Sequence, residues 1–323
     1  MVTAPSSEPA GLVTIGETMV LLDPPQVGLL RQATMLRVSM GGAESNVAIG
    51  VCRLGLPASW LGRVGADPFG DLVVTRLRGE GVDVSGVVRD PSVPTSLMVK
   101  ERRAPGAVRV FYYRTDGPGA RLQPSDLDPR RISGAQVLHL TGITPALSRS
   151  AAATTQRAAE LAHELGVVVS LDVNYRSALW SAQDAGAALT NLVKLADIVF
   201  ASDDEAELLG VRGEPIELAE QLAAMGPTQA VIKLGARGAV AWADGVAHQA
   251  AAVPVQAVDP VGAGDAFVAG YLTELMCGAP VPQRMDTAVR CGAFAVTMSG
   301  DWEALPTRAE LSLLTADPGQ VRR

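Results

Sequence analysis

A regular alternation of short apolar runs and longer amphipathic runs in the middle of the chain restricts the fold more than any other feature. Apolar runs at 137–140, 167–171 and 198–200 are separated by helix-like runs at 150–165 and 183–195. Strands that are joined by helical crossovers pair in parallel, and helices then cover both faces of the sheet. The alternation therefore predicts an α/β fold with a mainly parallel sheet.

Two segments in the first half of the chain interrupt this rhythm and are typical of β-structure. Residues 18–38 lack helical periodicity, and residues 88–122 contain two β-rich runs around the turn signal Ala104-Pro105-Gly106. We expect both segments to form a small β lid over the α/β part of the chain. The core is then one discontinuous domain made of residues 10–17, 39–87 and 123–312.

Composition excludes several classes of partner. The chain has 323 residues, 48% of them hydrophobic, and its formal charge of -7 is unsuited to a nucleic-acid phosphate backbone. No apolar run reaches a membrane-spanning length, the N-terminus lacks the basic start of a signal peptide, and the three cysteines are widely spaced. We therefore expect a cytoplasmic protein that binds a small molecule, without a nucleic-acid or membrane partner.

The most informative motif is Asp259-Pro260-Val261-Gly262-Ala263-Gly264-Asp265, which opens a predicted helix. The backbone N–H groups of Gly262, Ala263 and Gly264 can turn toward an anion, and the helix dipole favours negative charge at the same place. Asp265, in the first helical turn, could accept a hydroxyl proton while a phosphoryl group is held in line. An acid is also favourable there without any chemistry, so the catalytic interpretation depends on the surrounding motifs.

Polar residues follow two of the predicted strands, at the carboxyl edge where parallel sheets bind ligands. The run 167–171 continues into Asp172-Val173-Asn174-Tyr175-Arg176, and Arg176 could grip a carboxylate or phosphate or simply lie on a surface loop. Ser202 and Glu205 follow the run 198–200 with the spacing of a helix capping box, which alone explains both. Alternatively, Glu205 could hold Mg²⁺ through water molecules.

Two turns that contain glycine add candidate binding residues. Gly41 and Gly42 precede a predicted helix that carries Asn46, whose amide could hydrogen-bond a polyol. The run Lys233-Leu234-Gly235-Ala236-Arg237-Gly238 closes an apolar strand and could cover a nucleotide. Each run is also an ordinary turn when it is considered alone. Lysine never follows the glycine of a Walker-type phosphate loop, so that loop is excluded.

Taken together, these motifs resemble those of the ribokinase-like (PfkB) carbohydrate kinases over residues 13–311. The resemblance implies a three-layer α/β/α core with a β lid, and ATP-dependent phosphorylation of a sugar hydroxyl with ATP and Mg²⁺. Asp265 would be the catalytic base, Gly262 to Gly264 the anion hole, and Glu205 a water-mediated Mg²⁺ ligand, with Ser202 where relatives carry Asn. The implied ATP-binding residues are Asn174, Ser202, Glu205, Lys233, Gly235, Gly238, Gly262 and Gly264.

Within that family the chain is most similar to 2-keto-3-deoxygluconate kinases. The resemblance is carried by Gly16-Glu17, Gly42-Ala43-Glu44-Ser45-Asn46, Phe111-Tyr112-Tyr113-Arg114 and Asp172-Val173-Asn174-Tyr175-Arg176 with Leu179-Trp180. It implies that the substrate is bound by Gly41, Gly42, Asn46, Tyr112, Arg114, Arg176 and Asp265. The sequence departs from these enzymes at Met98, where relatives usually have Tyr, and at Thr115-Asp116-Gly117-Pro118-Gly119.

Three interpretations of function stay open at this point. The first is phosphorylation of 2-keto-3-deoxygluconate to its 6-phosphate, and the second is a kinase for fructose or another neutral sugar. The third is a sugar-binding protein without turnover. A dinucleotide-dependent oxidoreductase is disfavoured, because no G-x-G-x-x-G follows the first predicted strand. The resemblance also leaves open a monovalent cation such as K⁺ near Asp259. Exposed lid strands would offer unpaired edges, so we expect a homodimer through the lid or a higher homo-oligomer.

Overall fold

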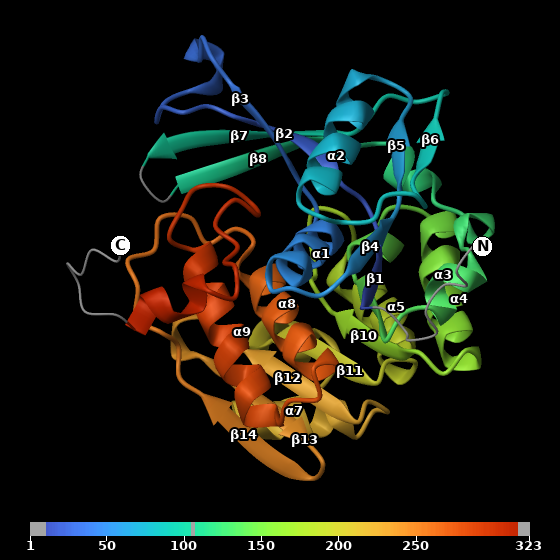
Figure 1. Ribbon diagram of the computed structural model, residues 1–323, viewed down its shortest axis with the longest axis vertical. Coiled ribbons are helices and arrows are strands. Elements are labelled where there is room, and N and C mark those ends of the chain that lie inside the picture. Colours follow the sequence, from blue (N-terminus) through green and yellow to red (C-terminus); the bar gives the residue numbers. More distant parts are fainter. Residues whose placement is uncertain (1–10, 105–106, 316–323) are drawn as a thin grey trace, which may run out of the picture.

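An eight-stranded sheet lies at the centre of the computed structural model, which describes residues 11–104 and 107–315 (Figure 1). Six neighbouring strands of this sheet pair in parallel, and the last two strands continue it with antiparallel pairing. From edge to edge the strands are β4 (Ala58–Leu61), β1 (Leu12–Ile15), β9 (Val137–Thr141), β10 (Val168–Asp172), β11 (Ile198–Ser202), β12 (Gln229–Lys233), β13 (Ala239–Ala243) and β14 (Val246–Ala250).

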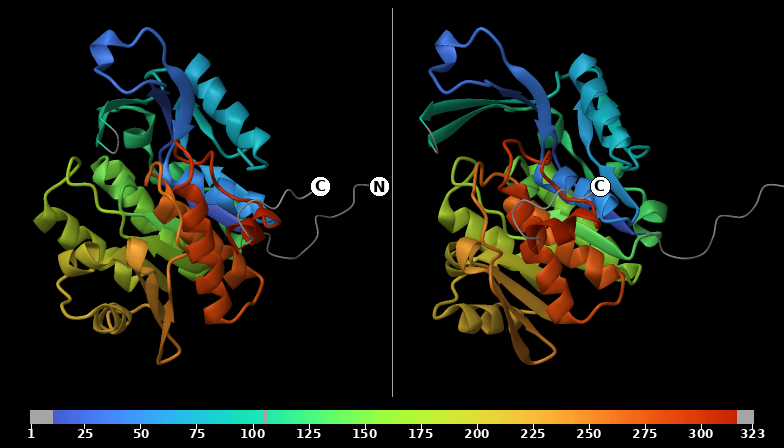
Figure 2. Two further views of the ribbon diagram at one scale, coloured as in Figure 1. Left: turned by 90° about the vertical axis from the view of Figure 1, so that its left-hand side faces the viewer. Right: turned by 60° about the vertical axis from the view of Figure 1, so that its left-hand side comes forward.

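Helices cover both faces of this sheet, and each face has its own apolar cluster (Figures 1 and 2). Strands that are buried on both faces consist largely of apolar residues, as β1 and β9 do here. One cluster contains side chains of α1 (Ala43–Arg53), α2 (Pro68–Gly79), α8 (Ala263–Met276) and α9 (Val281–Ala295). The other contains side chains of α3 (Pro129–Ser133), α4 (Arg149–Glu164), α5 (Ala182–Lys194), α6 (Asp203–Leu208) and α7 (Pro215–Ala223).

The predicted α/β class and its mainly parallel sheet are confirmed. The helix expected over 150–165 is α4, and the helix expected over 183–195 is α5. Short 3₁₀ helices complete the structure at η1 (Leu30–Gln32), η2 (Pro118–Arg121), η3 (Pro124–Asp126), η4 (Thr144–Ala146), η5 (Gly235–Arg237) and η6 (Glu310–Thr315). In the part of the chain that the structure describes, no helix is long and apolar enough to cross a bilayer.

A separate four-stranded sheet projects from one end of the core (Figure 1). Its order is β3 (Arg37–Gly41), β2 (Met19–Asp23), β7 (Leu97–Ala104) and β8 (Ala107–Tyr113), so β3 and β8 are its edges. All four strands lie within or next to the two segments expected to form the lid, although the boundary drawn between residues 38 and 39 falls inside β3. The division into core and lid stays a prediction, and residues 10 and 105–106 lie outside the described residues.

A two-stranded parallel sheet of β5 (Arg63–Gly65) and β6 (Val88–Asp90) lies next to the lid. The sequence did not indicate this pair, because strands of three residues are too short for a detectable hydrophobic period. Asp90 accepts a charged hydrogen bond from Arg63 across the pair, at 3.3 Å. The pair thus joins the start of the second lid segment to the core.

Candidate active site

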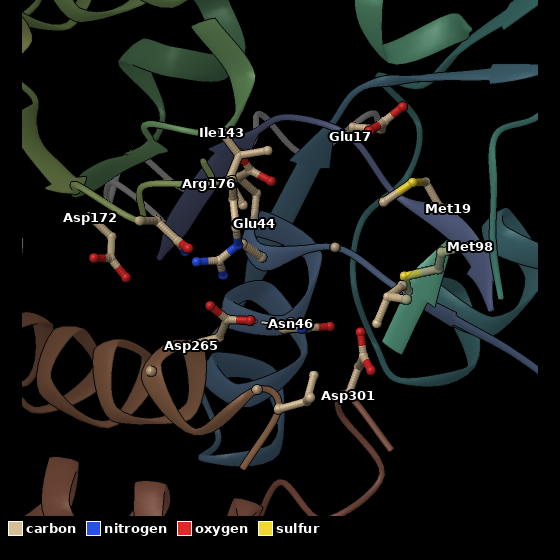
Figure 3. Close-up of a pocket in the computed structure, with 18 of the residues that line it drawn as sticks. Glu17, Met19, Glu44, Asn46, Met98, Ile143, Asp172, Arg176, Asp265 and Asp301 are labelled. Atoms are coloured by element: carbon tan, nitrogen blue, oxygen red, sulfur yellow. Dashed lines mark hydrogen bonds between the residues drawn. The ribbon is translucent and has the colours of Figure 1, made fainter. Parts of the chain in front are cut away.

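A cavity of about 440 Å³ lies where the carboxyl ends of the sheet strands face the lid (Figure 3). Side chains from both sheets, from the start of α8 and from the loop around Asp301 line it. Of the residues predicted for the site, the cavity brings together Gly41, Gly42, Asn46, Tyr112, Arg114, Asn174, Arg176, Ser202, Glu205, Lys233, Gly262, Gly264 and Asp265. Ala263, Gly235 and Gly238 do not line it.

Asp265 lies in the first turn of α8 and is 8% exposed. Its Oδ2 accepts a hydrogen bond from Asn46 Nδ2 at 2.8 Å, which ties the start of α8 to α1 (Figure 3). The pKa of this carboxyl is raised to about 7, mainly by burial; the nearby Asp172 adds to the rise, whereas the bond from Asn46 and the charges of Arg176 and Lys233 oppose it. A pKa close to neutral suits a general base, since such a group both accepts and releases a proton readily.

The glycine at position 262 is required by the backbone. It caps α8 with a φ of +78°, and a Cβ there would lie 2.0 Å from the carbonyl oxygen of Asp301. Both conditions exclude a side chain. The turn directs the start of α8, where N–H groups lack helical acceptors, toward the cavity. Ala263 N–H points back to the Pro260 carbonyl at 3.4 Å, so its part in an anion hole stays a prediction.

Lys233 and Asp172 form a short ion pair across the sheet. Lys233 Nζ lies 2.6 and 2.7 Å from the two carboxylate oxygens of Asp172, although β11 separates their strands. Burial alone would lower the pKa of Lys233, but Asp172, Glu205 and Asp265 outweigh it and raise that pKa. The ammonium group is therefore charged at neutral pH beside Gly264, 3.6 Å from where a Cβ of that residue would lie.

Ser202 and Glu205 form the capping box that their spacing predicts. Ser202 Oγ accepts from Glu205 N at 3.1 Å, and Glu205 Oε2 accepts from Ser202 N at 2.8 Å. Glu205 Oε1 accepts from Tyr175 N, also at 2.8 Å. Both carboxylate oxygens are thus engaged by the backbone, and contact with Mg²⁺ through water is the role still available to them. Within residues 11–104 and 107–315, no group of three acidic, His or Cys side chains is placed to hold a metal ion.

The two predicted substrate arginines have different surroundings. Arg114 Nη2 lies 2.7 Å from Glu17 Oε2, and its guanidinium lies 5.5 Å from the centre of the Tyr112 ring. Arg176 is exposed and donates to the Tyr175 carbonyl at 3.2 Å, and its guanidinium lies over Asp265 (Figure 3). No carboxylate among the described residues is within ion-pair distance of Arg176.

Sequence reasoning did not assign several charged residues of the cavity to the site, among them Lys100, Glu44 and Asp301. Lys100 is 1% exposed and lies 2.8 Å from Asp301 Oδ1, and Glu44 Oε1 accepts bonds from two threonine hydroxyls at 2.7 Å. A lysine directly after the apolar run at 97–99, in a chain with few lysines, was a usable signal for Lys100. Asp301 gave no signal, because it lies in an irregular loop that only the tertiary structure brings to the cavity.

Gly235 and Gly238 belong to the turn between β12 and β13. Gly238 has a φ of +93°, and a Cβ there would lie 2.0 Å from the carbonyl oxygen of Ala250. Both residues have positive φ values, so glycine is favoured for the shape of the turn itself. Their predicted contact with ATP stays a prediction.

Comparisons with known proteins agree with this geometry. A model of the pfkB family carbohydrate kinases matches residues 10–308. The chain is 38% identical over 314 residues to a 2-dehydro-3-deoxygluconokinase of Thermoproteus tenax, covering 95% of this chain and 94% of the relative. It is 32% identical over 310 residues to fructokinase-1 of Oryza sativa subsp. japonica, covering 93% and 96%.

A solved structure has a closely similar fold. It is the putative ribokinase II of E. coli in complex with ATP and Mg²⁺, which superposes with a TM-score of 0.88 at 25% sequence identity. The similarity covers 95% of this chain and 99% of that protein.

Proposed function

Since the chain belongs to the pfkB family of carbohydrate kinases, we propose that this ATP-dependent sugar kinase phosphorylates 2-keto-3-deoxygluconate at its 6-hydroxyl. This sugar acid is the compound that the relative's name calls 2-dehydro-3-deoxygluconate. ATP would supply the γ-phosphoryl group, with Mg²⁺ shielding its phosphates. As an ATP-consuming enzyme it fits the cytoplasmic location expected from composition.

Asp265 is the group we assign as general base. Its carboxylate would take the proton of the substrate hydroxyl while that oxygen forms a bond to the γ-phosphorus, and the bond from phosphorus to the leaving ADP oxygen breaks. The start of α8 and the Lys233 ammonium would stabilise the negative charge on the transferring group. Asn46 fixes the orientation of the base through the 2.8 Å hydrogen bond. Glu205 would reach Mg²⁺ through water.

A sugar acid is favoured as the substrate because the guanidinium of Arg176 has no ion-pair partner among the described residues. Lys100, Arg114 and Lys233 also line the cavity, and each lies within ion-pair distance of a protein carboxylate. Arg176 has no such partner among the described residues and lies at the same edge of the cavity as Asp265. A substrate carboxylate could supply the missing partner through the planar guanidinium.

A neutral sugar is the second candidate, and a specific observation favours it. Glu17 neutralises Arg114, and Met98, 5% exposed, lines the lid side of the cavity where relatives usually offer a tyrosine hydroxyl. With fewer hydrogen-bond donors for a carboxylate, the cavity would discriminate less strongly between a sugar acid and a neutral sugar. A binding protein without turnover is the third candidate, and it is disfavoured by a buried Asp265 whose pKa is near neutral.

The test is ADP release from MgATP with 2-keto-3-deoxygluconate, fructose and ribose. We expect turnover of the sugar acid, and Arg176→Gln should raise its KM by roughly tenfold to a hundredfold, the worth of a charged hydrogen bond. The matched control is Arg130→Gln, because Arg130 is 92% exposed and lies outside the cavity. Turnover of fructose alone, unaffected by Arg176→Gln, would replace the sugar acid by a neutral sugar. Absence of turnover with all three would favour the binding protein.

A homodimer through the lid is also part of this proposal. The edge strands β3 and β8 carry exposed apolar side chains, of which Val38 is 40% and Tyr113 is 63% exposed. Met35, which precedes β3, is 59% exposed. Unpaired strand edges with apolar side chains are suited to pairing with a second copy across a two-fold axis.

A further inference from the structure

Asp259 begins the loop that leads to the predicted anion hole. Its side chain is completely buried, and Oδ1 accepts a hydrogen bond from Val261 N at 3.2 Å, so this carboxylate shapes the turn before Gly262. A buried carboxylate is unfavourable unless a positive charge compensates it. The source of that positive charge therefore matters for the geometry of the loop.

Two cations from the lid strand β7 converge on Asp259. Lys100 Nζ lies 3.6 Å and Arg102 Nη2 lies 3.4 Å from Asp259 Oδ2. Lys100 also pairs with Asp301 at 2.8 Å, and Arg102 binds both oxygens of Asp23 at 3.1 Å. Burial alone would lower the pKa of both cations, but these acids raise the pKa values instead. Both groups are therefore charged at neutral pH.

This arrangement does not fit a monovalent cation at the Asp259 carboxylate. An added ion there would be a third positive charge beside Lys100 and Arg102, and like charges repel strongly in a buried site. Two further side chains that could offer oxygens to an ion, Asp23 and Ser299, already accept hydrogen bonds from Arg102.

We propose that Lys100 and Arg102 replace a monovalent cation at Asp259 and act as positioning residues for the anion-hole loop. Turnover is then independent of K⁺, and the position of lid strand β7 is coupled electrostatically to the start of α8. The inference rests on the proposed kinase function, because the loop matters for catalysis only if it binds a phosphoryl group.

The first test compares the sugar kinase activity in K⁺, Na⁺ and tetramethylammonium salts at equal ionic strength. We expect the same kcat and KM in all three, because the protein supplies its own cations. An activation of about tenfold or more by K⁺ over tetramethylammonium, a coupling of ~1.4 kcal/mol, would overturn the inference.

The second test removes the two cations with Lys100→Met and Arg102→Gln, singly and together. We expect kcat to fall by roughly a hundredfold, as expected for a misplaced catalytic group, with partial recovery in K⁺ or guanidinium salts. Arg103→Gln is the matched control, since Arg103 is the next residue of the same strand and is exposed. A fall in kcat that no added cation restores would overturn the claim that the two side chains take the place of an ion.

A readout without turnover separates this inference from the proposed function. The unfolding temperature of the unmodified protein should be equal in K⁺ and tetramethylammonium salts, whereas K⁺ should raise that of the double variant. If the double variant does not fold, the unmodified protein alone tests the inference. A rise in the unfolding temperature of the unmodified protein in K⁺ would overturn it. Absence of turnover in every salt would count against the proposed function alone.

Discussion

The charges that line the cavity divide into paired and unpaired groups. Lys233 is paired with Asp172 and Arg114 with Glu17, whereas Asp265 shares its hydrogen bond with a neutral amide. Asp265 and Arg176 both line the cavity, and neither has an ion-pair partner among the described residues. These two residues are where substitutions should separate catalysis from recognition.

Replacing Asp265 should remove activity and stabilise the protein. On folding, the pKa of this carboxyl rises from 3.8 to about 7, so its stabilising contribution is complete below 3.8 and is lost as pH rises to about 7. Above that pH the ionised carboxylate costs roughly 4 kcal/mol. In Asp265→Asn the bond from Asn46 is kept, so we expect a higher unfolding temperature with a larger gain at about pH 8 than at about pH 5.

The same variant should lose catalysis while it gains stability. A general base typically accelerates the chemical step by roughly 10²- to 10⁴-fold, so kcat should fall by that factor in the variant. Circular dichroism melts and ADP release measure the two effects on one preparation. Unchanged turnover would show that the buried carboxylate is not the base, and an equal gain in stability at both pH values would contradict its raised pKa.

The pH dependence of turnover follows from the same group. Asp265 accepts a proton only when ionised, so kcat/KM should rise as pH increases through about 7 and level off above it. The Arg176 charge lowers the pKa of Asp265, so Arg176→Gln should move the rising limb to higher pH. Steady-state rates across neutral pH measure this, and a limb that lies near the ordinary aspartate pKa would contradict the assignment.

At the scale of elements, α8 depends on the turn that precedes it. Gly262 needs a positive φ, and its missing Cβ leaves room for the carbonyl of Asp301, whereas Gly264 does not have a positive φ and a Cβ there would meet Lys233 Nζ at an ordinary contact distance of 3.6 Å. We expect Gly262→Ala to lower kcat by roughly a hundredfold, since the displaced loop misplaces the N–H groups. Gly264→Ala is the matched comparison and should fold normally. Equal activity of both variants would remove the anion-hole role of this turn.

The capping box illustrates how local sequence and tertiary position combine in one element. Ser202 and Glu205 start α6 as their spacing predicts, but the second oxygen of Glu205 binds Tyr175 N on the neighbouring loop. That extra bond holds the loop that carries Arg176 against the start of α6. A local helix signal therefore also positions a residue that we assign to substrate binding.

At the scale of the whole molecule, the proposed dimer depends on the two edges of the lid sheet. We expect a dimer in light scattering after size exclusion, and Val38→Lys with Tyr113→Lys should shift it to the monomer by placing charges on both edges. A comparable pair on the core, Leu165→Lys with Val246→Lys, replaces exposed apolar residues far from the lid and should leave the dimer intact. A monomeric unmodified protein would contradict the proposal directly.

Local patterns in the sequence determined the elements and the type of chemistry. The alternation of apolar and amphipathic runs predicted the parallel sheet, and strand ends with polar residues predicted its ligand-binding edge, because side-chain periodicity is a property of short segments that the sequence shows directly. The glycine turn before α8 and the capping box of Ser202 were predicted for the same reason.

Only the tertiary structure decided which charges meet. Lys100 reaches Asp259 and Asp301 from a lid strand far away in sequence, and Arg114 meets Glu17 across the base of the lid. Such pairs leave no periodic trace, because they depend on where distant loops are packed. The near-neutral pKa of Asp265 likewise arises from burial, which is a property of the assembled core and of no single segment.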